Sequence, residues 1–144
     1  MNFWPPLVGA GIRIDYIHPE YKQIDVSMKL HWWNANYVRT HFGGGMYMMA
    51  DPFFMYMLVK ILGENYIVWD KEATIRFLKP GRGTIRAHFE LTDEQISNLK
   101  SSLSERDKIT PTFTVKIVDS KNEVICEVDK KLYIRKKKDY SVLK

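Results

Sequence analysis

The sequence predicts an α+β fold in which an antiparallel sheet wraps around one long apolar helix. Several stretches alternate between apolar and polar residues, and residues 43–62 are apolar with almost no break. Alternation with a period of two is typical of strands that bury one face, whereas a long apolar segment is typical of a buried helix. Short turns join consecutive predicted strands, which favours antiparallel pairing.

Residues 12–17 and 24–30 predict the first two strands. In the first, Ile12, Ile14 and Tyr16 alternate with polar residues, and in the second every other residue from 24 to 30 is apolar. A His-Pro-Glu turn at 18–20 joins the two strands, which predicts a hairpin. Residues 31–42 follow without a clear period, and we expect a loop there.

The long apolar segment begins at three glycines, Gly43, Gly44 and Gly45, and ends at Gly63. Its length excludes a single strand, and we expect one helix. Five of the seven methionines lie in it, at positions 46, 48, 49, 55 and 57. Flexible thioethers suit an adaptable slot for an acyl chain. Apolar helices more often form plain core, so we expect only a minority of these residues to touch a ligand.

The second half of the chain predicts four more strands and a minor amphipathic helix. Alternation indicates strands at 67–77, 85–91, 113–117 and 123–135, with a hairpin turn at 119–122. Thr92 followed three residues later by Gln95 is a helix-start signal. Ile96, Leu99 and Leu103 then follow at helical spacing.

Composition is that of an ordinary globular domain. The chain has 144 residues, 45% hydrophobic and 27% charged, and we expect a single domain over 1–144, with a core at about 8–135 and a solvated basic tail at 136–144. No apolar run is long enough for a transmembrane helix, and no signal peptide is visible, so we expect a cytoplasmic protein without membrane association. Cys126, the only cysteine, supplies neither an internal disulfide nor a zinc cluster. The net charge of +5 suits an anionic partner.

Two segments and their spacing resemble a known family. Residues 36–44 read Asn-Tyr-Val-Arg-Thr-His-Phe-Gly-Gly, Asp51 lies fifteen positions after Asn36, and the strand at 75–83 ends in Lys-Pro-Gly-Arg-Gly. Together they resemble the hotdog-fold acyl-CoA thioesterases, in particular the PaaI-like proteins and the DUF4442 branch, from about residue 8 to 135. The segment departs from the family pattern where Phe42 separates the histidine from the glycines, and where Arg39 occupies a common glycine position.

The resemblance implies an acyl-CoA thioesterase that hydrolyses a fatty or aromatic acyl-CoA to the free acid and CoA, and that needs no metal and no cofactor beyond the CoA of its substrate. It implies that the Gly43 N–H stabilises the oxyanion and that Asp51 acts as general base or nucleophile. It also implies a site shared by two chains, with Asn36, His41 and Gly43 from one chain and Asp51 and Asp70 from the other, in a homodimer or homotetramer. Free N–H groups and the positive end of a helix dipole at Gly43 suit this role.

Each candidate residue also has a structural interpretation. The glycines permit a tight turn, and Asp51 before Pro52 can be the cap of a second helix. Asn36 can support a turn, and His41 can brace Asn36 rather than bind the thioester carbonyl. Asp70 and Glu72, two apart on one strand, are expected on the same face, where Asp70 either assists the catalytic acid or lies at an exposed strand end.

The phosphates of CoA require cations, and Arg76, Lys79 and Arg82 lie near one turn. They can equally be solvated strand ends. Two other functions stay open: a non-catalytic acyl- or CoA-binding module, and a hydratase or dehydratase of the same fold. The absence of histidine between 43 and 63 counts against the second. Nucleic-acid binding is suggested only by the pI and the aromatic content, and we expect none.

Overall fold

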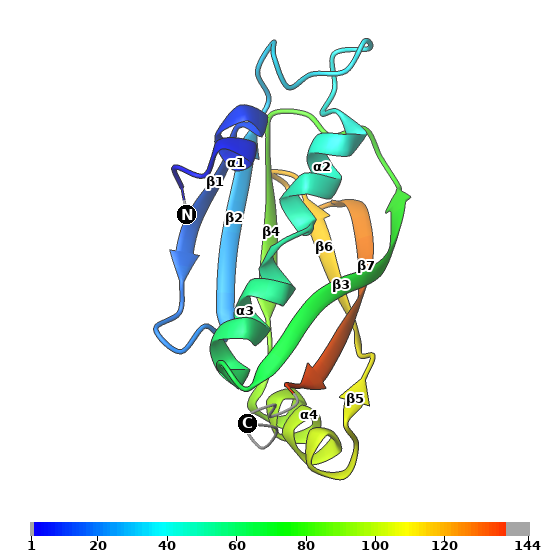
Figure 1. The fold of residues 1–144 in the computed structure, drawn as a ribbon. Coiled ribbons are helices and arrows are strands. Elements are labelled where there is room, and N and C mark those ends of the chain that lie inside the picture. The colour runs from blue at the N-terminus through cyan, green and yellow to red at the C-terminus, as the bar shows by residue number, and fades with distance from the viewer. Residues whose placement is uncertain (1, 138–144) are drawn as a thin grey trace.

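The computed structural model describes residues 2–137, and these form one antiparallel sheet with helices against it (Figure 1). The expected α+β architecture is confirmed. The sheet has seven strands in the order β1-β2-β4-β6-β7-β3, with β5 pairing to β7 beside this path. The strands are β1 (Ile12–Ile17), β2 (Gln23–Lys29), β3 (Tyr66–Phe77), β4 (Thr84–Glu90), β5 (Lys108–Ile109), β6 (Thr112–Val118) and β7 (Val124–Lys136).

The apolar segment lies across the sheet as two consecutive helices, α2 (Gly43–Ala50) and α3 (Phe53–Leu62), and not as one (Figure 1). Pro52 causes the break, because it has no N–H to donate to the carbonyl of Met48 and its ring crowds that carbonyl. Helical bonding resumes when Tyr56 N donates to Pro52 O at 2.9 Å. The break places Asp51 at the junction of the two helices.

The core lies between these helices and the inward face of the sheet. Phe53, Phe54, Met57 and Leu58 are buried on α3, and the alternating apolar residues of β2, β4, β6 and β7 face them. Met46 and Met49 are core residues, whereas Met48 is exposed. Most methionines therefore pack in the interior, as expected.

Two short elements are not predicted from the sequence. Helix α1 (Pro5–Ala10) packs beside β1, and the two-residue strand β5 pairs with the end of β7. Helix α4 (Asp93–Glu105) begins where expected, because the Thr92 side chain accepts from Gln95 N and the Gln95 side chain accepts from Thr92 N. None of the described helices is long and apolar enough to cross a membrane. Of the predicted basic tail, residues 138–144 lie outside the described part.

Candidate active site

Two of the predicted site residues, Asp51 and Asp70, meet at one ammonium group. Lys130 Nζ, from β7, lies 2.6 Å from Asp51 Oδ1 and 2.9 Å from Asp70 Oδ1. The first contact is a hydrogen bond, and the second is an ion pair without hydrogen-bond direction. Nζ also donates to the Tyr47 hydroxyl at 3.3 Å. The cluster joins the end of α2 to β3 and β7, three elements far apart in sequence.

Lys130 is fully buried, whereas the Asp51 and Asp70 side chains are 43% and 27% exposed. Its position follows from the alternation of β7, where Cys126, Val128, Leu132 and Ile134 also face inward. Sequence analysis does not single out Lys130 or Tyr47. The sequence does contain a signal for Lys130, because it is the one charged residue among the alternate, otherwise apolar positions of β7 that face inward.

A β-bulge corrects the expectation that Asp70 and Glu72 share a face. Asp70 pairs with Leu132, but Glu72 pairs with Lys131, so the register shifts by one residue at Lys71. A one-residue shift turns the following side chains to the opposite face. Asp70 therefore points inward to Lys130, while Glu72 points outward and lies 3.5 Å from Lys131.

Burial and the ion pairs within the cluster shift the pKa values of Asp70, Lys130 and Tyr47. Burial raises the pKa of Asp70 against the opposing effect of Lys130. Burial lowers the pKa of Lys130, but its contacts with Asp51 and Asp70 outweigh this and leave the pKa raised. Lys130 is therefore a permanent cation at neutral pH. Burial also raises the pKa of the Tyr47 phenol, which stays protonated.

Asp51 does not cap the second helix. It is the C-terminal cap residue of α2, and α3 has Pro52 at its N-cap position with no side-chain cap hydrogen bond. The carboxylate contacts Lys130 instead. The segment therefore forms two helices, as the structural interpretation of Asp51 requires, but Asp51 does not cap the second helix.

The beginning of α2 forms a second group of predicted residues. The first helical hydrogen bond runs from Met46 N to Phe42 O, and no described residue accepts from the N–H groups of Gly43, Gly44 or Gly45. A cavity of about 380 Å³ adjoins Gly43 and is lined by Asn36, Thr40, His41, Met46 and the 77–81 turn. Free N–H groups at a helix start that borders a cavity can bind an oxyanion.

Asn36 and His41 hold the loop beside this cavity. Asn36 Oδ1 accepts from Val38 N and Thr40 N, and its Nδ2 donates to Thr40 Oγ1 at 2.8 Å, which is the bonding of a turn-supporting residue. Arg39 adopts φ of +62°, in the left-handed region that favours glycine.

His41 is buried and braces the loop at 81–83. Its Nε2 lies 2.9 Å from Gly83 O, and because a carbonyl only accepts, Nε2 carries the proton. Burial lowers the pKa of His41, so the ring is neutral and Nδ1 is an acceptor that has no partner among residues 2–137. A Cβ at Gly81 would lie 2.9 Å from the terminal methyl of Ile125 and 3.2 Å from the His41 ring, so a larger residue here would displace one of these side chains.

One helix separates the two groups of residues. Helix α2 has eight residues, so at 1.5 Å per residue Gly43 and Asp51 lie about 12 Å apart. A general base must lie within hydrogen-bond reach of the reacting atoms, directly or through one water. Within one chain, therefore, Gly43 and Asp51 cannot act on the same carbonyl group.

The three predicted phosphate-binding cations differ in their surroundings. Arg76 lies on the outer face of β3 and pairs with Glu127 at 2.6 Å and Asp129 at 2.9 Å. Lys79 lines the cavity next to Gly43 but pairs with Glu123 at 2.7 Å. Arg82, in the same turn, is exposed and forms no ion pair with a described residue.

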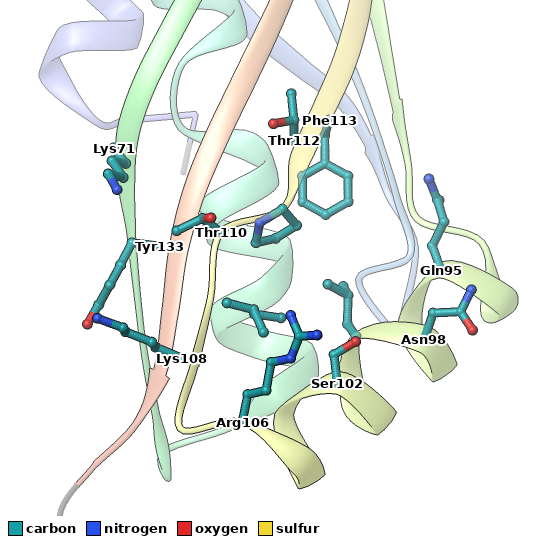
Figure 2. Close-up of a pocket in the computed structure, with 13 residues that line it drawn as sticks. Lys71, Gln95, Asn98, Ser102, Arg106, Lys108, Thr110, Thr112, Phe113 and Tyr133 are labelled. Atoms are coloured by element: carbon teal, nitrogen blue, oxygen red, sulfur yellow. The ribbon is translucent and has the colours of Figure 1, made fainter.

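Two further cavities lie away from the predicted catalytic and phosphate-binding residues, although the second borders Gly44, Gly45 and Met48. One, of about 720 Å³, lies between α4 and the ends of β5, β6 and β7, and Figure 2 shows Lys71, Arg106 and Lys108 around it. The other, of about 480 Å³, is lined mainly by apolar groups of α1 and the first turn of α2. The described residues hold no group of three or more histidine, cysteine or acidic side chains that could bind a metal ion.

The arrangement of the sheet and its central helix defines a hotdog fold, and solved structures share it. A Pseudomonas aeruginosa protein described as a probable thioesterase superposes with a TM-score of 0.77 at 24% identity, covering 89% of this chain and 85% of that one. A Haemophilus influenzae thioesterase gives 0.68 at 15% identity, with 93% and 85% covered. The Escherichia coli PaaI protein gives 0.64 at 20%, with 90% and 87% covered.

Residues 1–134 match the family model of DUF4442, a domain of unknown function, and the chain belongs to this family. No protein with a curated description is significantly similar to the sequence.

Proposed function

We propose that this protein is an acyl-CoA thioesterase whose active site is shared by two copies of the chain. The observation that carries the proposal is the Asp51 carboxylate, which is half-exposed at the end of α2 and held at one oxygen by a buried lysine. Lys130 fixes the direction of this carboxylate while part of the side chain stays open to solvent, which suits a general base or nucleophile. The thioesterase names of the structural relatives support the same reaction class.

In the proposed reaction, the acyl carbonyl of the substrate accepts a hydrogen bond from the Gly43 N–H at the start of α2 in one chain. The second chain supplies Asp51, which either takes a proton from the attacking water or attacks the carbonyl itself to form an anhydride. Negative charge then develops on the carbonyl oxygen, where the N–H and the helix dipole stabilise it. The C–S bond breaks and CoA leaves as a thiolate. If water attacked, the thiolate takes up the proton held by Asp51. If Asp51 attacked, water then hydrolyses the anhydride, which releases the acid, restores the Asp51 carboxylate and supplies the proton to the thiolate. Asn36 and His41 keep the Gly43 loop in shape, and Asp70 anchors Lys130.

Strand β3 supports assembly through a second copy. It lies at an edge of the sheet, and its twelve residues pair on one side with β7 only. Trp69 and Phe77 on this strand are 48% and 55% exposed. Long, partly apolar edge strands are commonly protected by pairing. We therefore expect a homodimer or homotetramer, which brings Asp51 of one chain to Gly43 of the other.

The first test is release of CoA from acyl-CoA substrates of different chain length, combined with complementation. Asp51→Asn and Gly43→Pro each remove one half of the shared site. In a random mixture about half of the dimers are mixed, and each has one intact site, so about a quarter of the wild-type activity is expected to return on co-expression. Activity no higher than that of either variant, or a monomer of 17.0 kDa by light scattering, would exclude the shared site.

A second prediction concerns the CoA phosphates. Arg82→Gln should raise KM several-fold with kcat almost unchanged, because a phosphate contact contributes equally to substrate and transition-state binding. Arg13→Gln, an exposed cation on β1, is the matched control and should leave KM unchanged. If Arg82→Gln and Lys79→Gln both keep the wild-type KM, the phosphates bind elsewhere.

A further inference from the structure

Lys130 occupies a place where stability alone favours an apolar residue. Its neighbours on the inward face of β7, Val128 and Leu132, are buried and apolar. A buried ion pair often contributes less to stability than well-packed apolar side chains of similar volume, because its groups must leave water. A lysine with no exposed surface at this position therefore indicates a role other than packing.

The ammonium group is held by hydrogen bonds to Asp51 and Tyr47 and by an ion pair with Asp70, which excludes it as a base or nucleophile. It has three N–H donors, and three oxygens surround it, from Asp51, Asp70 and Tyr47. Because those contacts stabilise the charged form, Lys130 holds its proton. Its available action is that of a fixed positive charge on the carboxylates.

Two carboxylates and one ammonium leave one negative charge without a partner. Asp70 is the more buried acid, and Asp51 the more exposed, at 27% and 43%. Asp51 Oδ1 is bound to Nζ, and Oδ2 lies outside this contact. We therefore assign the unpartnered charge to Asp51, the more exposed of the two acids.

We propose that Lys130 is a positioning residue that keeps Asp51 and Asp70 ionised together and orients Asp51 for reaction through Oδ2. Both acids lie within a few ångströms of the same nitrogen, and two carboxylates that share a site without a cation do not both stay ionised. Tyr47 from α2, Asp70 from β3 and Lys130 from β7 are the titratable groups that face Asp51. The inference rests on the proposed function where it makes Asp51 the reacting group.

Lys130→Met tests the proposal, because methionine is unbranched and apolar and suits the inward face of β7. Removal of the cation disfavours the ionised acids, so the acidic limb of the kcat/KM profile should move to higher pH by about 1–2 units. Lys130→Arg keeps the positive charge, so the acidic limb of this variant should lie closer to the wild-type position than that of Lys130→Met. Lys131→Met, on the outer face of the same strand, is the matched control and should not move it. A lysine with only a structural role would change stability and leave the limb in place.

Carbon-13 NMR titration of the aspartate carboxyls gives a second readout that does not depend on turnover. The signals are assigned with Asp51→Asn and Asp70→Asn. A higher pKa for either carboxyl in Lys130→Met supports the proposal, even if no acyl-CoA is hydrolysed and the proposed function fails. Unchanged carboxyl titrations overturn it, even in an active thioesterase. If Lys130→Met does not fold, Lys130→Gln replaces it, because glutamine keeps a hydrogen-bond donor without the charge. A raised carboxyl pKa in this variant supports the proposal, and unchanged carboxyl titrations overturn it.

Discussion

Asp51→Asn is expected to lower kcat at least ~100-fold, the low end of the effect of removing a general base. Asparagine keeps the size of the side chain and an oxygen that can accept from Lys130, but it cannot take a proton or attack a carbonyl at neutral pH. The CoA-release assay measures the loss. The same fall is expected whether Asp51 acts as base or nucleophile, and incorporation of ¹⁸O from labelled water into the Asp51 carboxylate in a single turnover would identify it as the nucleophile.

The fold should tolerate this change. Lys130 retains Asp70 at 2.9 Å, so the loss of one charged contact should cost about 1.5–3 kcal/mol at most, which urea unfolding can measure. Glu72→Gln is the matched control. Glu72 lies on the same strand as Asp70 but on the opposite face, and we expect wild-type kcat from it. A fully active Asp51→Asn enzyme would rule out the proposed mechanism.

The sheet and its helices could be predicted because burial imposes a simple pattern on them. On β2, Ile24, Val26 and Met28 are all buried between less buried residues, which is the alternation visible in the sequence. Helix α4 shows both its start signal and its apolar spacing. Helix α1 and strand β5 are too short for either pattern. They depend on contacts with β1 and β7 that no local sequence reveals.

The site was predictable only in part, because its geometry depends on contacts between distant elements. The significance of the spacing between Asn36 and Asp51 depends on a family resemblance, because the chemistry of Asp51 before Pro52 by itself favours a helix cap over a catalytic acid. Lys130 is adjacent to Lys131, so the pair resembles a solvated strand end. Alternation separates them, since Lys130 follows the buried Val128 while Lys131 pairs with the exposed Glu72.

The prediction that Asp70 and Glu72 share a face is wrong because the register between β3 and β7 shifts between them. A β-bulge inserts a residue without an obvious sequence signal, and the one at Lys71 sends Asp70 inward and Glu72 outward. Counting by two from the sequence places them on the same face. The bulge therefore determines which of the two acids joins Lys130.

Gly43→Pro is expected to lower kcat by about 10²–10³-fold, the usual effect of removing one oxyanion donor. Proline lacks the N–H but is compatible with the backbone here. Gly43 is the first residue of α2, where proline is favoured, and Phe42 before it is extended with ψ of 130°. No described residue accepts from the Gly43 N–H, so the substitution removes no hydrogen bond of the fold.

Gly43→Ala is the matched variant, because it adds the same Cβ and keeps the N–H. That Cβ would lie 3.1 Å from the Phe77 ring, which is over half exposed and can move. Thermal unfolding should therefore be similar for both variants, and only the proline variant should lose kcat. If the proline ring merely obstructed binding, KM would rise at unchanged kcat. Equal kcat in the two variants would show that the Gly43 N–H is not the oxyanion donor, and the beginning of α2 would then serve the fold alone.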